Sequence, residues 1–155
     1  MSEGKDGIQE RWQNVHGLLE RLLQERQTLI VQYCKLTGAR TYTPGEEKTL
    51  SRIRRFCQTL VDYVSAGHFE VYAELLNEAE AFDDGSAESA KVLLPQINIS
   101  TGAAVEFNDL YEGAEGPFVN LATRLSTLGE LLESRFQYED ELIEKLHDAH
   151  REQVA

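Results

Sequence analysis

The chain has 155 residues, enough for one domain whose hydrophobic core needs no metal or disulfide to hold it together. Its formal net charge of -12 argues against direct binding to nucleic acid, because neutralising phosphates requires a basic surface. No stretch approaches the roughly 20 apolar residues of a membrane span, and the polar N-terminus lacks the pattern of a signal peptide, so we expect a cytosolic protein.

The negative charge is concentrated in the middle of the chain. Residues 1–68 carry 10 basic and 8 acidic side chains, residues 69–115 carry 1 and 11, and residues 116–155 carry 4 and 8. Such a field would speed the encounter with a basic partner. Acidity of this kind can also serve solubility alone, and this alternative stays open.

The first predicted helix spans about residues 8–37, and residues 1–7 are expected to form a flexible N-terminus before a single helical domain over residues 8–152. Gly38 ends the helix, because glycine accepts the positive φ common just past a helix C-terminus. Arg26 is the one charged exception in a seven-residue apolar repeat. The apolar members of this repeat are Trp12, Val15, Leu19, Leu22, Leu29 and Tyr33.

A loop over residues 38–45 leads to a second predicted helix that starts near Glu46. Three arginines, Arg52, Arg54 and Arg55, lie beside its apolar stripe, and we expect them to pair with nearby acidic side chains. The apolar pattern is interrupted at Gly67, where we expect a kink, and a third helix follows over about residues 68–82.

A fourth helix is predicted over about residues 86–111, and a last helix over about residues 118–152. Pro95 falls inside the fourth helix and removes a backbone donor, so a kink or short break is expected near Leu94. No segment clearly shows the alternation of apolar and polar residues that is typical of a β-strand. The sequence therefore predicts an all-α protein: a single bundle of about five helices, two of them long.

Motifs for catalysis are absent, so we expect a protein that is not an enzyme and holds no cofactor. Cys34 and Cys57 lie within helical patterns beside apolar residues and are expected to be buried, reduced thiols. A single Glu-x-x-His spacing, Glu144 with His147, falls short of the two that a di-metal bundle needs. Other residues that could converge on a metal inside the bundle are His16, Glu20, His68, Glu139 and His150. A metal-binding, hemerythrin-like helical protein therefore remains an alternative.

The run over residues 56–72, FCQTLVDYVSAGHFEVY, contains residues that helix packing does not explain. Asp62, Ser65 and Phe69 lie beside the interruption at Gly67 and have no obvious place in a core. A large apolar residue beside a carboxylate and a hydroxyl at a helix bend is a candidate contact site for a partner. A packed helix corner is the alternative interpretation.

This run resembles the Rsd/AlgQ family of bacterial regulators, whose members carry a nearly identical FCQ-S/T-LVDY-hydrophobe-SAGHF-x-hydrophobe-Y segment. The resemblance covers nearly the whole chain after residue 8, with matching segments in the same order and spacing. These further segments are ERW at 10–12, QERQTLI at 24–30, LLNEAEAF at 75–82, LGELLESRF at 128–136 and EDELIEKLHDAH at 139–150.

The resemblance implies an anti-sigma factor that binds the primary sigma factor of RNA polymerase, mainly through its C-terminal promoter-recognition domain, and masks it stoichiometrically. In this family the residues associated with sigma contact match Asp62, Ser65 and Phe69. Asp62 would pair with a basic side chain, Ser65 would form a hydrogen bond, and Phe69 would fill an apolar pocket. An acidic adaptor for a metabolic or stress-signalling protein is a further alternative. The oligomeric state stays open, and a monomer is the simplest expectation.

Overall fold

The computed structural model describes residues 2–37, 47–66, 70–113 and 120–151, and these ranges consist of helices and short turns with no strand among them. Seven helical elements follow one another along the described chain. They are α1 (Ser2–Thr37), α2 (Glu47–Ala66), α3 (Tyr72–Phe82), α4 (Ser86–Lys91), α5 (Leu94–Tyr111), α6 (Leu121–Leu146) and the short 3-10 helix η2 (Asp148–His150). The predicted all-α bundle is confirmed, with α1 and α6 as its two longest helices.

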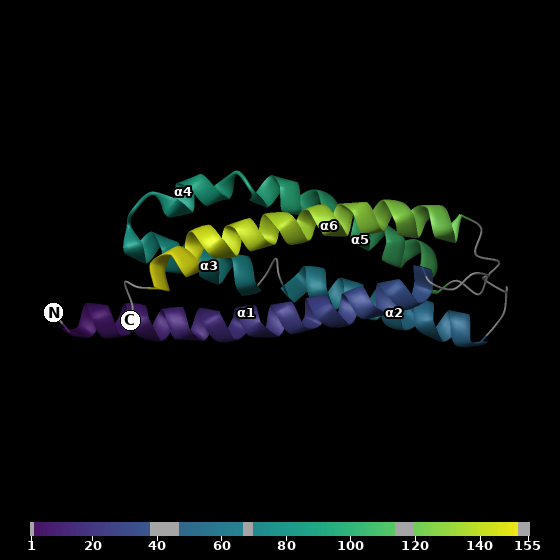
Figure 1. Ribbon diagram of the computed structural model, residues 1–155, viewed down its shortest axis with the longest axis horizontal. Helices are drawn as coiled ribbons and strands as arrows, with labels where there is room; N and C mark the ends of the chain where they lie inside the picture. The colour runs from purple at the N-terminus through teal and green to yellow at the C-terminus, as the bar shows by residue number, and fades with distance from the viewer. Residues whose placement is uncertain (1, 38–46, 67–69, 114–119, 152–155) are drawn as a thin grey trace.

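The helices form an elongated bundle of two layers (Figure 1). α1 runs the length of the molecule and packs against α2 and α3, while α6 packs against α5 and α4 in the other layer. α2 also contacts α5 and so joins the two layers. The start of α1 and the 3-10 helix η2 lie at the same end of the bundle.

The apolar repeat of α1 faces the core as predicted. Trp12, Val15, Leu19, Leu22 and Leu29 are all buried. The helix begins at Ser2, earlier than expected, so part of the expected N-terminal segment lies within α1. None of the helices in the described part of the chain is long and apolar enough to cross a membrane.

The region predicted as one helix over residues 86–111 consists of two helices. α4 ends at Lys91 and α5 begins at Leu94, with Pro95 in the first turn of α5. Proline is tolerated in a first turn because the missing backbone donor has no intrahelical partner there. The expected kink at Gly67 lies outside the described residues.

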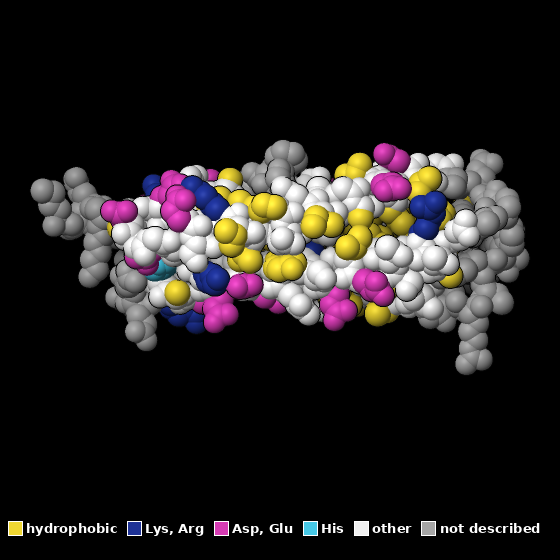
Figure 2. Space-filling model, turned by 90° about the horizontal axis from the view of Figure 1, so that it is seen from above, with side chains coloured by type: hydrophobic (Ala, Val, Ile, Leu, Met, Phe, Trp, Pro, Cys, Tyr) yellow, Lys and Arg dark blue, Asp and Glu magenta, His cyan; other side chains and the backbone are white. Residues whose placement is uncertain are grey.

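Hydrophobic side chains also gather on the outside of the layer that contains α5. Figure 2, seen from above, shows them along much of the length of this face. On α5 itself, Ile99, Val105 and Leu110 are exposed, whereas Ile97, Ala104 and Phe107 are buried in the core. The outer side of α5 therefore carries apolar side chains among its polar ones.

A close approach between α1 and α6 depends on a glycine. The Tyr33 hydroxyl donates a hydrogen bond to the Leu125 carbonyl at 2.8 Å. A Cβ atom on Gly129 would lie only 2.1 Å from that hydroxyl oxygen, so the tyrosine ring occupies space that any other residue at position 129 would fill.

The two cysteines differ in exposure. Cys57 is buried as predicted, but the prediction for Cys34 is wrong, because this side chain is exposed. The seam of α1 passes through Tyr33 and Leu36, and Cys34 lies on the outer side of the helix between them. Burial, together with the nearby Glu112 carboxylate, raises the pKa of the Cys57 thiol to about 11.

We expect a thiol reagent at pH 8 to modify Cys34 of the folded protein rapidly, because this side chain is exposed. Cys57 should react at least about 100-fold more slowly, because little of it is thiolate at that pH and the reagent cannot reach it. Both thiols should react after denaturation, and Cys34→Ser should abolish the fast phase. Two fast thiols in the folded protein would contradict this assignment.

Candidate partner-binding surface

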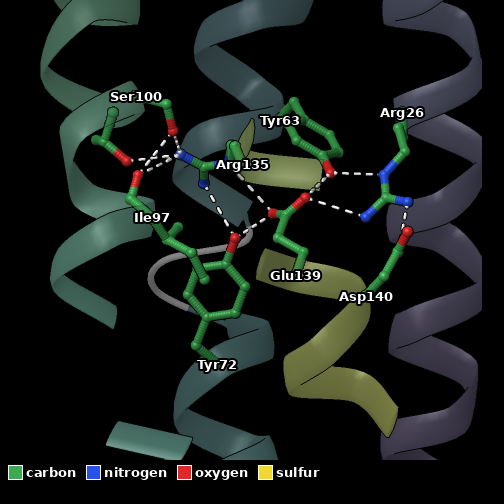
Figure 3. Close-up of polar contacts among 9 residues, drawn as sticks. Arg26, Tyr63, Tyr72, Ile97, Ser100, Arg135, Glu139 and Asp140 are labelled. Carbon is green, nitrogen blue, oxygen red and sulfur yellow. Dashed lines mark hydrogen bonds and ion pairs between the residues drawn. The ribbon is translucent and has the colours of Figure 1, made fainter. Parts of the chain in front are cut away.

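A buried carboxylate joins helices from both layers. Glu139 of α6 is fully buried, and each of its oxygens accepts two hydrogen bonds (Figure 3). One oxygen accepts from the Tyr63 hydroxyl at 2.5 Å and from Arg26 at 3.1 Å. The other accepts from the Tyr72 hydroxyl and from Nε of Arg135 at 3.2 Å. Four donors thus compensate the burial of this charge.

Arg135 extends the network to α5. Its guanidinium is fully buried and donates to the hydroxyls of Ser100 at 3.1 Å and Thr101 at 2.7 Å. A second nitrogen donates to the Tyr72 hydroxyl at 3.1 Å. The network therefore links α1, α2, α3, α5 and α6 through hydrogen bonds to charged groups, which are stronger than those between neutral groups.

The charge states of the network are fixed by its surroundings. Burial and the neighbouring Glu139 raise the pKa of Tyr63 and of Tyr72, so both hydroxyls stay protonated and can donate. Burial opposes the charge of Arg26, but its contacts with Tyr63, Asp140 and Glu139 hold the pKa of the guanidinium above its ordinary value. Arg26 also donates to Asp140 at 2.7 Å. The one charged exception in the apolar repeat is thus a partly buried side chain that anchors α1 to the core.

This network lies behind the place where α2 ends and α3 begins, and we refer to the described residues there, 62–66 and 70–72, as the corner. Tyr63 directly follows Asp62 near the end of α2, and Tyr72 is the first residue of α3. Both tyrosines point inward to the same carboxylate, so the two sides of the corner are tied to one point in the core.

The structure places two of the three predicted contact residues at this corner. Asp62 is exposed and accepts a hydrogen bond from the side chain of Gln58 at 3.0 Å. Ser65 is half-buried, one turn further along α2. Phe69 lies outside the described residues.

Glu25 of α1 lies near both Asp62 and Glu70, so acidic side chains from three segments share this surface. Glu25 of α1 has a pKa that is raised by partial burial and by the nearby carboxylates of Asp62 and Glu70, while Arg21 opposes the shift. A small cleft between α1 and the corner is lined by Leu18, Arg21, Glu25 and Glu70. The contribution of α1 to this surface was missed in the sequence, because nothing in the spacing of Glu25 shows which helix packs beside it.

The histidines that suggested a metal site are engaged with carboxylates and with each other. Nδ1 of His147 lies 3.1 Å from both oxygens of Glu78, and its Nε2 lies 3.1 Å from Nδ1 of His16. His150 lies 2.6 Å from Asp84. Burial raises the pKa of Glu78, and the hydrogen bond to His147 acts in the opposite direction.

The predicted metal ligands do not converge in the described part of the chain. Glu144 is exposed whereas His147 is buried, so the single Glu-x-x-His spacing does not form a site. Glu139 is committed to the network of tyrosines and arginines, and His68 lies outside the described residues. No group of three or more metal-binding side chains occurs among the residues that the structure describes.

Comparison with known proteins decides the family. The family described as regulator of RNA polymerase sigma(70) subunit, Rsd/AlgQ, matches residues 1–147. The chain belongs to the Rsd/AlgQ family. The resemblance found in the sequence is therefore confirmed over nearly the full length of the chain.

Two relatives of this Rsd/AlgQ member are proteins named Regulator of sigma D. One is from Escherichia coli strain K12 / DH10B and the other from Shigella boydii serotype 18. Each is 35% identical over 153 residues, and the match covers 94% of both chains. No solved structure matches this chain.

We expect Glu139→Gln to lower the free energy of unfolding by about 3 kcal/mol or more, since removing one partner of a buried ion pair leaves the others uncompensated. The new amide nitrogen would also face groups that donate hydrogen bonds. Urea unfolding followed by circular dichroism measures the loss. Glu130→Gln, at an exposed position of the same helix, is the control and should cost less than about 0.5 kcal/mol. Equal stability of the two variants would contradict the role given to the network.

Proposed function

We propose that this protein is an anti-sigma factor that binds the primary sigma factor of bacterial RNA polymerase, chiefly its C-terminal promoter-recognition domain. The observation that carries the proposal is the family match across residues 1–147, supported by relatives that are themselves named regulators of sigma D. Binding one regulator per sigma would repress or redirect transcription by masking. Such a role needs no catalysis and no cofactor, and it places the protein in the cytoplasm beside RNA polymerase.

The negative charge of the corner favours binding to a partner with a basic surface. A sigma domain that grips promoter phosphates through a helix-turn-helix must present a basic surface. Glu25, Asp62 and Glu70 together present negative charge to such a surface. An acidic surface that covers these cations would compete directly with promoter DNA.

In this proposal Asp62, Ser65 and Phe69 have distinct roles. Asp62 is exposed and pairs with a basic side chain of sigma, Ser65 forms a hydrogen bond, and Phe69 fills an apolar pocket. The buried network limits how far the corner can move, so little conformational entropy is lost when the partner binds.

We expect purified protein to form a saturable complex with the primary sigma factor at one regulator per sigma, measured by isothermal titration calorimetry. Asp62→Lys should weaken the complex at least about tenfold, because it places a cation against a basic partner. Asp109→Lys makes the same charge change at an exposed position on α5 and is the control. Association should slow as salt rises, whereas dissociation should change less.

Two results would contradict this proposal. One is the absence of a complex at micromolar concentration and moderate salt. The other is an equal loss of affinity in the Asp62 and Asp109 variants, which would place the contact elsewhere. An acidic adaptor for a different protein would give the first result.

We expect Phe69→Ala to weaken the complex by about 2 kcal/mol or more if the ring is a buried anchor in the interface. The helical circular dichroism spectrum and the unfolding midpoint should stay unchanged, since the ring would then lie outside the core. A variant that loses its fold would instead assign Phe69 to the core and remove it from the proposed contact set.

A further inference from the structure

A groove lined by basic side chains runs between α1 and α2, in contrast to the acidic surface near Asp62. α1 and α2 lie side by side (Figure 1), and a hollow of about 600 Å³ opens between the second half of α1 and the first half of α2. Among the residues that the structure describes, its lining includes three cations, Lys35 of α1 and Arg52 and Arg55 of α2, and no acidic side chain. A protein with a net charge of -12 thus presents a local basic surface here.

These cations lack partners in the described part of the chain. Ion pairs occur elsewhere among the described residues, but none involves Lys35, Arg52 or Arg55. The expected pairing of Arg52, Arg54 and Arg55 with nearby acidic side chains is therefore not seen among those residues. Three like charges that share one groove repel each other, and an anionic occupant would relieve this repulsion.

The shape of the groove suits a segment of polypeptide. α1 lines it with residues from 24 to 35 at three- and four-residue steps, a stripe about 16 Å long at 1.5 Å per residue. Within the stripe, Val31 is 42% exposed and is the one apolar side chain of the described lining. A groove between two helices can accept a third helix, which here would meet one apolar side chain, Val31, among polar and charged ones.

One polar atom distinguishes a polypeptide from a phosphate-rich ligand. The side-chain oxygen Oε1 of Gln32, another lining residue, is buried and has no hydrogen-bond partner among the described residues. A buried acceptor without a partner costs about 1–3 kcal/mol, so it favours an occupant that brings a donor. Ionised phosphates bring mainly acceptors, whereas a polypeptide brings N–H groups as well as carboxylates.

We propose that this groove binds an acidic, amphipathic segment of a protein partner. Carboxylates of the segment pair with Lys35, Arg52 and Arg55, an apolar residue packs on Val31, and a donor satisfies Gln32. The groove lies at the start of α2, whereas Asp62 and Ser65 lie near its end. The inference is independent of sigma binding, because it rests on this groove and not on the acidic corner.

The test uses a short synthetic helical peptide with glutamates on one face and leucines on the other. A matched peptide with lysines in place of the glutamates and inorganic tripolyphosphate serve as comparison probes. Fluorescence anisotropy of the labelled peptide measures affinity, and amide chemical shifts of ¹⁵N-labelled protein locate the contact. We expect saturable binding of the acidic peptide, with shifts confined to α1 residues 24–35 and the first half of α2.

Variants then test the cations. Arg52→Gln combined with Arg55→Gln should weaken peptide binding at least about tenfold. Arg54→Gln removes the same charge at an exposed position of α2 outside the groove lining and should leave affinity within about twofold. Circular dichroism checks that each variant retains its helices.

Four results would overturn the proposal. The first is no saturable binding of the acidic peptide. The second is binding by tripolyphosphate that displaces the peptide and is tighter, which would make the groove an oligophosphate site. The third is an equal loss in the Arg54 variant, which would indicate attraction by overall charge. The fourth is self-association that depends on Arg52 and Arg55, since the occupant would then be a second copy of the chain. Sigma binding measured on the same variants should be unchanged, so failure of one proposal can be separated from failure of the other.

Discussion

The burial of Glu139 is the constraint on which the arrangement of the bundle depends. An ionised carboxylate in a protein core is tolerated only with several hydrogen bonds or ion pairs. Here the donors come from four helices, and Arg135 adds a fifth through the hydroxyls of α5. Sliding any one of these helices by a turn would leave a charge or a hydroxyl unpaired. Apolar packing alone would tolerate several registers, whereas this network selects one.

Through Tyr63 and Tyr72, the burial of Glu139 also fixes the position of surface residues at the end of α2 and the start of α3. Tyr63 and Tyr72 hold the two sides of the α2–α3 corner to one carboxylate, so Asp62 is presented from a helix whose rotation is fixed. A contact surface that is already in place loses less entropy on binding than one that must be ordered. Stability of the core and presentation of the proposed sigma contact are thus consequences of one interaction.

Sequence patterns predicted local structure well and contacts between helices poorly. The apolar repeat located the seam of α1, and proline chemistry located the interruption before Pro95, because both depend on neighbours in the sequence. Arg26 was recognised as an exception, but its partners lie far away in sequence and could not be read from spacing. Cys34 was placed on the wrong side of the helix, since it lies one residue from the seam. The part that Glu25 plays at the corner depends on which helix packs beside α1, and no local pattern encodes that.

The first half of α2 carries exposed positive charges and the second half carries the negative charge of Asp62, so this helix has an electric dipole moment along its length. Arg52 and Asp62 are separated by about 15 Å along the helix, which exceeds the Debye length of about 8 Å at physiological ionic strength. A partner close to the surface would therefore sense each half separately, while at low salt a distant one would sense both. The resulting torque would rotate an incoming charged protein toward its docking orientation before any contact forms. Orientation, and not only attraction, would then depend on ionic strength.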